Sequence, residues 1–177
     1  MASVPQPRRA PHTRTPRIVI SRKAQLSEEQ KAAIGLVGEV SARAWLERRY
    51  SDVHWISGYA AVLNEDAAAS DSHGYDFEVA YRSTTRLYEV KATSESDTER
   101  MEFELGVSEE RAAREYARGT RYRILLITSA LDPERRQVLE LPNPFAAAGR
   151  DRFRVVGRGL RYQFSPTHGA SRPISKK

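Results

Sequence analysis

The spacing of apolar side chains predicts a group of strands in the middle of the chain. Residues 75–81 and 85–91 mix apolar and polar side chains on either side of a tight turn near residues 82–84, which predicts two paired strands. Residues 122–128 (YRILLIT) are almost continuously apolar, which is typical of a strand buried on both faces. Shorter strands are predicted at residues 53–56, 102–105 and 137–141, and a terminal hairpin is predicted within residues 153–164.

Two segments carry the signals of helices. Residues 27–49 begin with Ser27 and Gln30, which have the spacing of a capping box, and they end in basic residues that suit the helix dipole. Residues 108–118 begin with Ser108 as the N-cap, with acidic residues in the first turn and a glycine directly after the end. Both segments are therefore expected to be helical.

The order of these elements predicts an α/β fold with a mixed central β-sheet flanked by helices, in the order α-β-β-β-α-β. Residues 57–74 are rich in small and polar side chains and are expected to form a loop. Residues 1–25 contain four prolines and six basic residues but no acidic residue, so we expect a flexible arm or linker there. A domain over residues 26–165 and a basic tail over residues 166–177 complete the expected organisation.

Composition excludes several kinds of site. The chain has no cysteine, which excludes disulfides, zinc–thiolate sites and cysteine nucleophiles and fits a cytoplasmic location. No apolar run approaches the roughly 20 residues that cross a bilayer, and no signal peptide is apparent. We therefore expect no membrane partner.

The charge is unevenly distributed along the chain. The net charge is +6, yet residues 26–148 hold 15 basic and 22 acidic residues, so the ends are basic and the middle is acidic. This distribution favours a polyanionic partner that the ends hold while carboxylates cluster between them. Solvated basic tails that keep the chain soluble are the alternative.

The two central strands bring charged side chains together. If they form a hairpin centred on Arg82 and Ser83, Asp76 lies opposite Glu89. Side chains alternate between the two faces of a sheet, so one face is apolar and the other is charged. The apolar face carries Phe77, Val79, Tyr88 and Val90, and the charged face carries Asp76, Glu89 and Lys91.

Adjacent carboxylates on one face repel each other unless a cation compensates them. Magnesium prefers oxygen ligands, and a nearby lysine can hold a phosphate oxygen or orient a water molecule. Asp76, Glu89 and Lys91 therefore suit metal-assisted hydrolysis of a phosphodiester bond. In the structural alternative, Asp76 only ends a turn, and Glu89 and Lys91 form the exposed face of an edge strand.

Glu39 adds a separate indication. It is the only charged residue of the stretch AAIGLVGEVSA, so its carboxylate is expected to be buried and to need a partner. A metal ion, a metal-bound water molecule or Lys91 would serve. A structural pair with Arg43, or with a backbone amide, is the alternative.

The order of Asp76, Glu89, Val90 and Lys91 resembles the D…(D/E)-x-K signature of the PD-(D/E)XK nuclease superfamily, although the first motif reads Gly-Tyr-Asp rather than Pro-Asp. More narrowly, the chain resembles the NO VEIN C-terminal domain family over about residues 30–145. The segments that carry this resemblance are IGLVGEVSARAWL, GYDFEV, YEVKATSES and FELGVSEERAA.

The resemblance implies a restriction-endonuclease-like core and a function for each site residue. It implies a magnesium ion, with manganese as a substitute, held by Asp76, Glu89 and the carbonyl of Val90. It also implies that Lys91 is the catalytic lysine and that Glu39 is an auxiliary acid. Candidates for phosphate contacts are Thr93, Arg111 and Arg114.

From the residues and the resemblance together we expect a magnesium-dependent endonuclease domain that hydrolyses DNA, with RNA as an alternative substrate. A restriction or phage-defence system is the expected setting, with other domains or subunits of that system as partners and a homodimer as an open alternative. Two other functions remain. One is a nucleic-acid-binding module that does not cleave, and the other is a module of the same fold that docks a partner protein.

Overall fold

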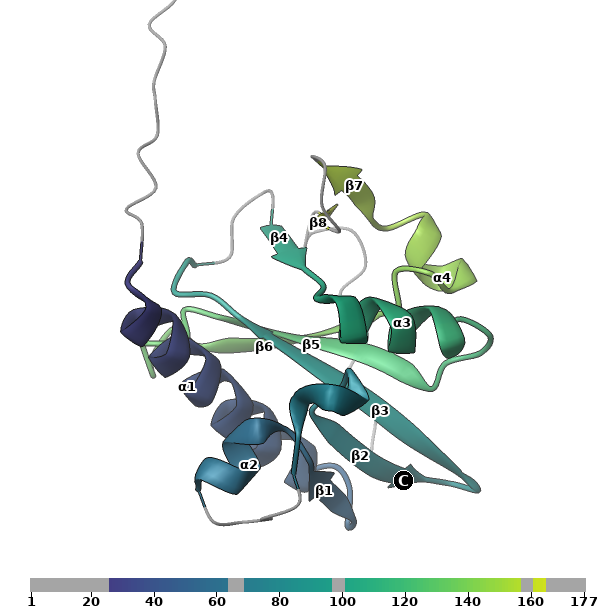
Figure 1. The fold of residues 1–177 in the computed structure, drawn as a ribbon, viewed down its shortest axis with the longest axis horizontal. Helices are drawn as coiled ribbons and strands as arrows, with labels where there is room; N and C mark the ends of the chain where they lie inside the picture. The colour runs from purple at the N-terminus through teal and green to yellow at the C-terminus, as the bar shows by residue number, and fades with distance from the viewer. Residues whose placement is uncertain (1–25, 64–68, 97–100, 157–160, 165–177) are drawn as a thin grey trace, which may run out of the picture.

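A five-stranded mixed sheet forms the centre of the computed structural model, which describes residues 26–63, 69–96, 101–156 and 161–164 (Figure 1). In this sheet β3 and β5 are parallel, and the other neighbouring strands are antiparallel. The predicted α/β fold with a mixed sheet flanked by helices is confirmed. In spatial order the strands are β1 (Val53–Trp55), β2 (Phe77–Tyr81), β3 (Thr84–Ala92), β5 (Tyr122–Thr128) and β6 (Gln137–Pro142).

The hairpin of β2 and β3 has the predicted register. Phe77 pairs with Tyr88, and Tyr81 pairs with Thr84, so Arg82 and Ser83 form the turn. Arg82 has a φ of 55°, the left-handed conformation that a tight hairpin turn requires. Because the register is fixed, the polar side chains near the end of the hairpin lie on one face, as the sequence predicts.

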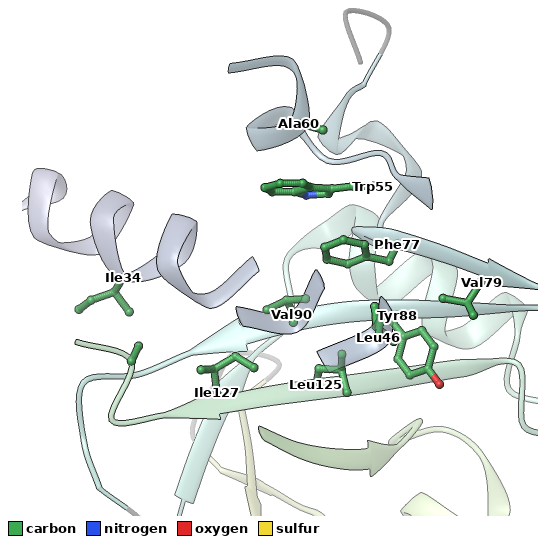
Figure 2. Packing of buried hydrophobic residues seen from close by; sticks show 12 residues of the cluster. Ile34, Leu46, Trp55, Ala60, Phe77, Val79, Tyr88, Val90, Leu125 and Ile127 are labelled. Carbon is green, nitrogen blue, oxygen red and sulfur yellow. The ribbon is translucent and has the colours of Figure 1, made fainter. Parts of the chain in front are cut away.

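Helix α1 (Glu28–Glu47) covers one face of the sheet. Tyr88 and Val90 from β3 and Leu125 and Ile127 from β5 belong to the core beneath this helix, as Figure 2 shows. The capping box of Ser27 and Gln30 is present as predicted.

Helix α3 (Val107–Glu115) covers the opposite face. Leu87 of β3, together with Ile124 and Leu126 of β5, packs in a second core with the alanines of this helix. Strand β5 is therefore buried on both faces, which explains its continuous run of apolar residues.

A second sheet of three strands extends the core under α3. Its order is β4, β8, β7. The strand predicted near residues 102–105 therefore pairs with residues 161–164 and not with the central sheet. The predicted terminal hairpin is confirmed as the antiparallel pair β7–β8, and its turn lies outside the described residues. These elements are β4 (Met101–Glu104), α4 (Ala147–Arg150), β7 (Arg154–Val156) and β8 (Arg161–Phe164).

Two segments differ from the prediction. Helix α3 begins one residue before Ser108, with Gly106 as its N-cap, because the Glu109 carboxylate accepts the Gly106 N–H at 2.8 Å, and it ends at Glu115, three residues before the predicted end. The expected loop at residues 57–74 contains two short helices, and the carboxylate of Asp71 accepts the N–H of Gly58 at 2.6 Å and joins them. These helices are α2 (Gly58–Val62) and the 3-10 helix η1 (Asp71–His73).

The predicted arm at residues 1–25 and the predicted tail at residues 166–177 lie outside the described residues. No helix within the described ranges combines the length and the apolar composition that a membrane crossing requires.

Candidate active site

Asp76 lies directly before β2, and its backbone forms hydrogen bonds with residues on both neighbouring segments. Its N–H donates to the Tyr88 carbonyl at 2.8 Å, and its carbonyl accepts the N–H of Ile56 at 2.9 Å. Its side chain reaches the next strand, where Oδ2 accepts the N–H of Val90 at 2.7 Å. The position of this carboxylate is therefore set by three strands of the sheet.

The loop before Asp76 is pressed against α3. Gly74 has a φ of 76°, and a Cβ at this position would overlap the carbonyl oxygen of Ser108 in the first turn of α3. The hydroxyl of Tyr122 donates to the Gly74 carbonyl at 3.0 Å. Only a glycine combines this backbone conformation with such a close approach.

Glu89 and Lys91 extend from β3 toward α3. Glu89 is buried, with 3% of its surface exposed, and its Oε1 lies 2.9 Å from the ammonium of Lys91. Asp76 keeps part of its surface open to solvent. The structure thus brings Asp76, Glu89 and Lys91 together on the face that the hairpin register predicts, and solvent reaches the site on the side of Asp76.

The two carboxyl groups oppose each other's ionisation. Burial raises the pKa of Asp76 well above its ordinary value, and the charge of Glu39 adds to this, while the Val90 N–H and Lys91 act against it. Burial also raises the pKa of Glu89, and the charge of Asp76 raises it further. Both groups would therefore gain from a cation placed between them.

Glu109 of α3 is a member of this cluster that sequence reasoning missed. Its Oε2 lies 2.5 Å from the ammonium of Lys91. Burial alone would lower the pKa of Lys91, but Glu89 and Glu109 together raise it. The sequence shows Glu109 only as one of two neighbouring acids in a first helical turn, and no local signal tells which of the two faces the sheet.

Glu39 has two hydrogen-bond partners that the sequence does not indicate. The carboxylate accepts the indole N–H of Trp55 at 2.6 Å and the hydroxyl of Ser57 over a shorter distance. Lys91 pairs with Glu89 and Glu109. Burial still raises the pKa of Glu39, and its charge acts on Asp76, so Glu39 is an electrostatic neighbour of the site.

The three residues predicted to contact phosphate each have a partner elsewhere in the fold. The Thr93 hydroxyl oxygen accepts the N–H of Glu95 at 3.1 Å, and Arg111 donates to the carbonyl of Ser72 at 3.4 Å. Arg114 pairs with Glu110 and also lies over the ring of Phe145 at 4.1 Å. Their contact with a phosphate stays a prediction.

The oxygen atoms near Asp76 suit a hard divalent cation. Carboxylates and a backbone carbonyl are the ligands that magnesium selects, and both carboxyl groups have a pKa raised by their burial. Within the described residues no group of three or more histidine, aspartate or glutamate side chains is arranged around a metal position. The predicted ligand set of Asp76, Glu89 and the Val90 carbonyl stays a prediction.

Comparison with known proteins gives one match. No curated protein and no solved structure matches the chain. The family model described as Protein NO VEIN, C-terminal, matches residues 41–141, which are more than half of the chain. The matched segment includes Asp76, Glu89, Lys91 and Glu109, whereas Glu39 precedes it. The chain therefore belongs to the NO VEIN C-terminal family.

Proposed function

We propose that this chain is a metal-dependent nuclease domain of the PD-(D/E)XK type that hydrolyses phosphodiester bonds in DNA. One observation carries the proposal. Asp76 and Glu89 form a carboxylate pair whose pKa values are both raised, and Lys91 lies beside Glu89 on the same face. A buried charged cluster of this kind lowers the stability of the fold. Such clusters, with shifted pKa values, are common at sites where a protein carries out chemistry.

Each side chain has a distinct function in the proposed reaction. Asp76, Glu89 and the Val90 carbonyl would hold a magnesium ion, with manganese as a substitute. When bound, such an ion lowers the pKa of a water molecule and offsets charge on the attacked phosphate. The Lys91 ammonium would donate a hydrogen bond to a phosphate oxygen where negative charge develops. The partial exposure of Asp76 would admit the substrate.

DNA is the proposed substrate because the chain carries a net charge of +6, with basic residues concentrated at both ends of the sequence. Contacts to backbone phosphates alone read little sequence, so specificity would come from other domains or subunits. A restriction or phage-defence setting follows from the resemblance. A cytoplasmic location, an alternative RNA substrate and a homodimer belong to the same proposal.

Cleavage of supercoiled plasmid tests the proposal. The parent, Lys91→Ala and Asp76→Asn would be compared in magnesium, manganese and EDTA, with Lys31→Ala as the control because Lys31 is an exposed lysine on α1. We expect metal-dependent nicking by the parent and by Lys31→Ala, and a rate at least about 100-fold lower for the two site variants. Equal cleavage by Lys91→Ala and Asp76→Asn would refute the assignment.

One observation favours a second candidate, a nucleic-acid-binding module without cleavage. Lys91 is held by two carboxylates, Glu89 and Glu109, and such an ion-pair network can be purely structural. A binding module would bind nucleic acid with a steep salt dependence, would not cleave it in any metal, and would keep its affinity in Asp76→Asn.

A further inference from the structure

Lys91 is held from two different elements of the fold. Its ammonium lies 2.9 Å from Oε1 of Glu89, which is two residues away on the same strand, and 2.5 Å from Oε2 of Glu109 on α3. The side chains of Lys91 and Glu109 are 20% and 23% exposed. The contact between β3 and α3 is thus partly shielded from water, where charge-assisted hydrogen bonds are strong.

Glu109 is itself firmly placed. The oxygen that contacts Lys91 also accepts the Gly106 N–H at 2.8 Å, which fixes the carboxylate to the start of its own helix. The hydroxyl of Tyr122 lies 3.5 Å from the Glu109 carbonyl and 3.0 Å from the Gly74 carbonyl. One tyrosine therefore connects the backbone of Glu109 to the loop that leads into Asp76.

The neighbouring acid provides a contrast. Glu110 pairs with Arg114 on the same helix at 2.6 Å. Among the acidic residues of the first turn of α3, Glu109 is the one that contacts Lys91. The same helical turn thus offers a matched pair of glutamates with different surroundings.

We infer that Glu109 is a positioning residue, which holds the Lys91 ammonium in place for the reaction proposed above. This inference rests on the proposed nuclease function. In that reaction Glu89 would also hold a metal ion, so a second anchor would help to keep the long and flexible lysine side chain in place. Glu109 supplies the second anchor from a separate element, and α3 becomes part of the active site.

Kinetics of Glu109→Gln test the inference. Glutamine keeps an acceptor for the Gly106 N–H but removes the charge that faces Lys91. In single-turnover cleavage we expect the rate constant to fall about 10- to 100-fold, as misplacement of a catalytic group does, while DNA affinity changes by less than about twofold. Glu110→Gln should cleave like the parent.

A double variant shows whether Glu109 acts through Lys91. If it does, Lys91→Ala combined with Glu109→Gln cleaves no more slowly than Lys91→Ala alone. A further loss of rate in the double variant would overturn the inference, as would parental activity of Glu109→Gln.

Thermal unfolding in EDTA separates this inference from the proposed function, because it needs no activity. We expect the shifts in Tm of Lys91→Ala and Glu109→Gln to be non-additive in the double variant, since each removes the same contact. If the parent does not cleave but the shifts are non-additive, the proposed function fails and Glu109 remains the anchor of Lys91. If the parent cleaves and the shifts are additive, the inference fails and the nuclease assignment stands.

Discussion

The backbone N–H of Val90 donates a hydrogen bond of 2.7 Å to Oδ2 of Asp76, so the backbone of β3 orients a side chain that precedes β2. The carbonyl oxygen of an asparagine can accept the same hydrogen bond. The variant Asp76→Asn therefore removes the charge of this residue while it keeps the connection between the two strands.

Stability of the metal-free protein should depend on pH through this pair. Burial raises the pKa of Asp76 and of Glu89 in the folded protein, whereas both groups keep ordinary values near about 4 in the unfolded chain. At a pH between the ordinary pKa values of the unfolded chain and the raised pKa values of the folded protein, the folded protein holds protons that the unfolded chain has released. The contribution of the pair to the free energy of unfolding is therefore full below pH about 4 and is lost as pH rises through the folded pKa values.

We accordingly expect Asp76→Asn to be more stable than the parent at pH 8 in EDTA, with a smaller difference at pH 5. Each kcal/mol would raise the Tm by about 2–4 °C in a protein of this size. Thermal denaturation followed by circular dichroism measures the difference, and added magnesium should reduce it by stabilising the parent. A Tm of Asp76→Asn below that of the parent at pH 8 would contradict the electrostatic account.

Gly74→Ala should destabilise the fold strongly. The new Cβ would overlap the Ser108 carbonyl oxygen, and the φ of 76° is unfavourable for alanine. Gly119→Ala is the matched control, because Gly119 has a φ of 91° but nothing within 4 Å of the added Cβ. We expect a loss of about 1–2 kcal/mol for the control and at least about 3 kcal/mol for Gly74→Ala in urea unfolding. Equal losses would show that the close approach to α3 is absent.

Gly38→Ala should also destabilise, although alanine favours helices. Gly38 allows α1 to approach β3, and a Cβ there would lie 2.5 Å from the Cβ of Ala92. At Gly35, also on α1, the added Cβ would meet the hydroxyl of Tyr59, the far end of a side chain that can move. We expect Gly35→Ala to be near neutral and Gly38→Ala to cost about 1–3 kcal/mol, as overpacking does. A more stable Gly38→Ala would indicate that α1 lies farther from the sheet.

The fold should need the Glu39 side chain as a hydrogen-bond acceptor more than it needs its negative charge. Glu39→Ala leaves the Trp55 indole N–H and the Ser57 hydroxyl without this acceptor in a buried site, at a cost of about 2–4 kcal/mol. Glu39→Gln keeps an acceptor oxygen and should cost about 1 kcal/mol or less. Urea unfolding followed by tryptophan fluorescence compares the two. If glutamine were as damaging as alanine, the negative charge itself would be structural.

The hairpin could be predicted because its information is local. A turn at Arg82 and Ser83 fixes which residues of the two strands face each other. Side chains alternate between the two faces of a sheet, so the common face of Asp76, Glu89 and Lys91 follows from the sequence. Strand β5 could be predicted in the same way, since its nearly continuous run of apolar side chains is typical of a strand buried on both faces. These parts of the site needed no knowledge of the tertiary structure.

Contacts between elements that are distant in the sequence could not be predicted from local patterns. Glu109 meets Lys91 only because α3 returns across the sheet, and the sequence does not record which side of the helix faces inward. The partners of Glu39 come from β1 and the start of α2, which the local pattern of α1 does not indicate. The alternation of residues 101–104 marks a strand, yet its pairing with β8 depends on residues about sixty positions later.

The pairing of β4 with β8 joins two parts of the chain that the family match separates, because the match ends at residue 141. Phe103 of β4 packs against Tyr162 and Phe164 of β8, directly before the helix that carries Glu109. A fragment cut at residue 141 would lack Tyr162 and Phe164, expose Phe103 to water and leave α3 without part of its support. We therefore expect the smallest unit that folds on its own to be larger than the segment that the family model matches, so a fragment prepared for study should retain the chain through Phe164.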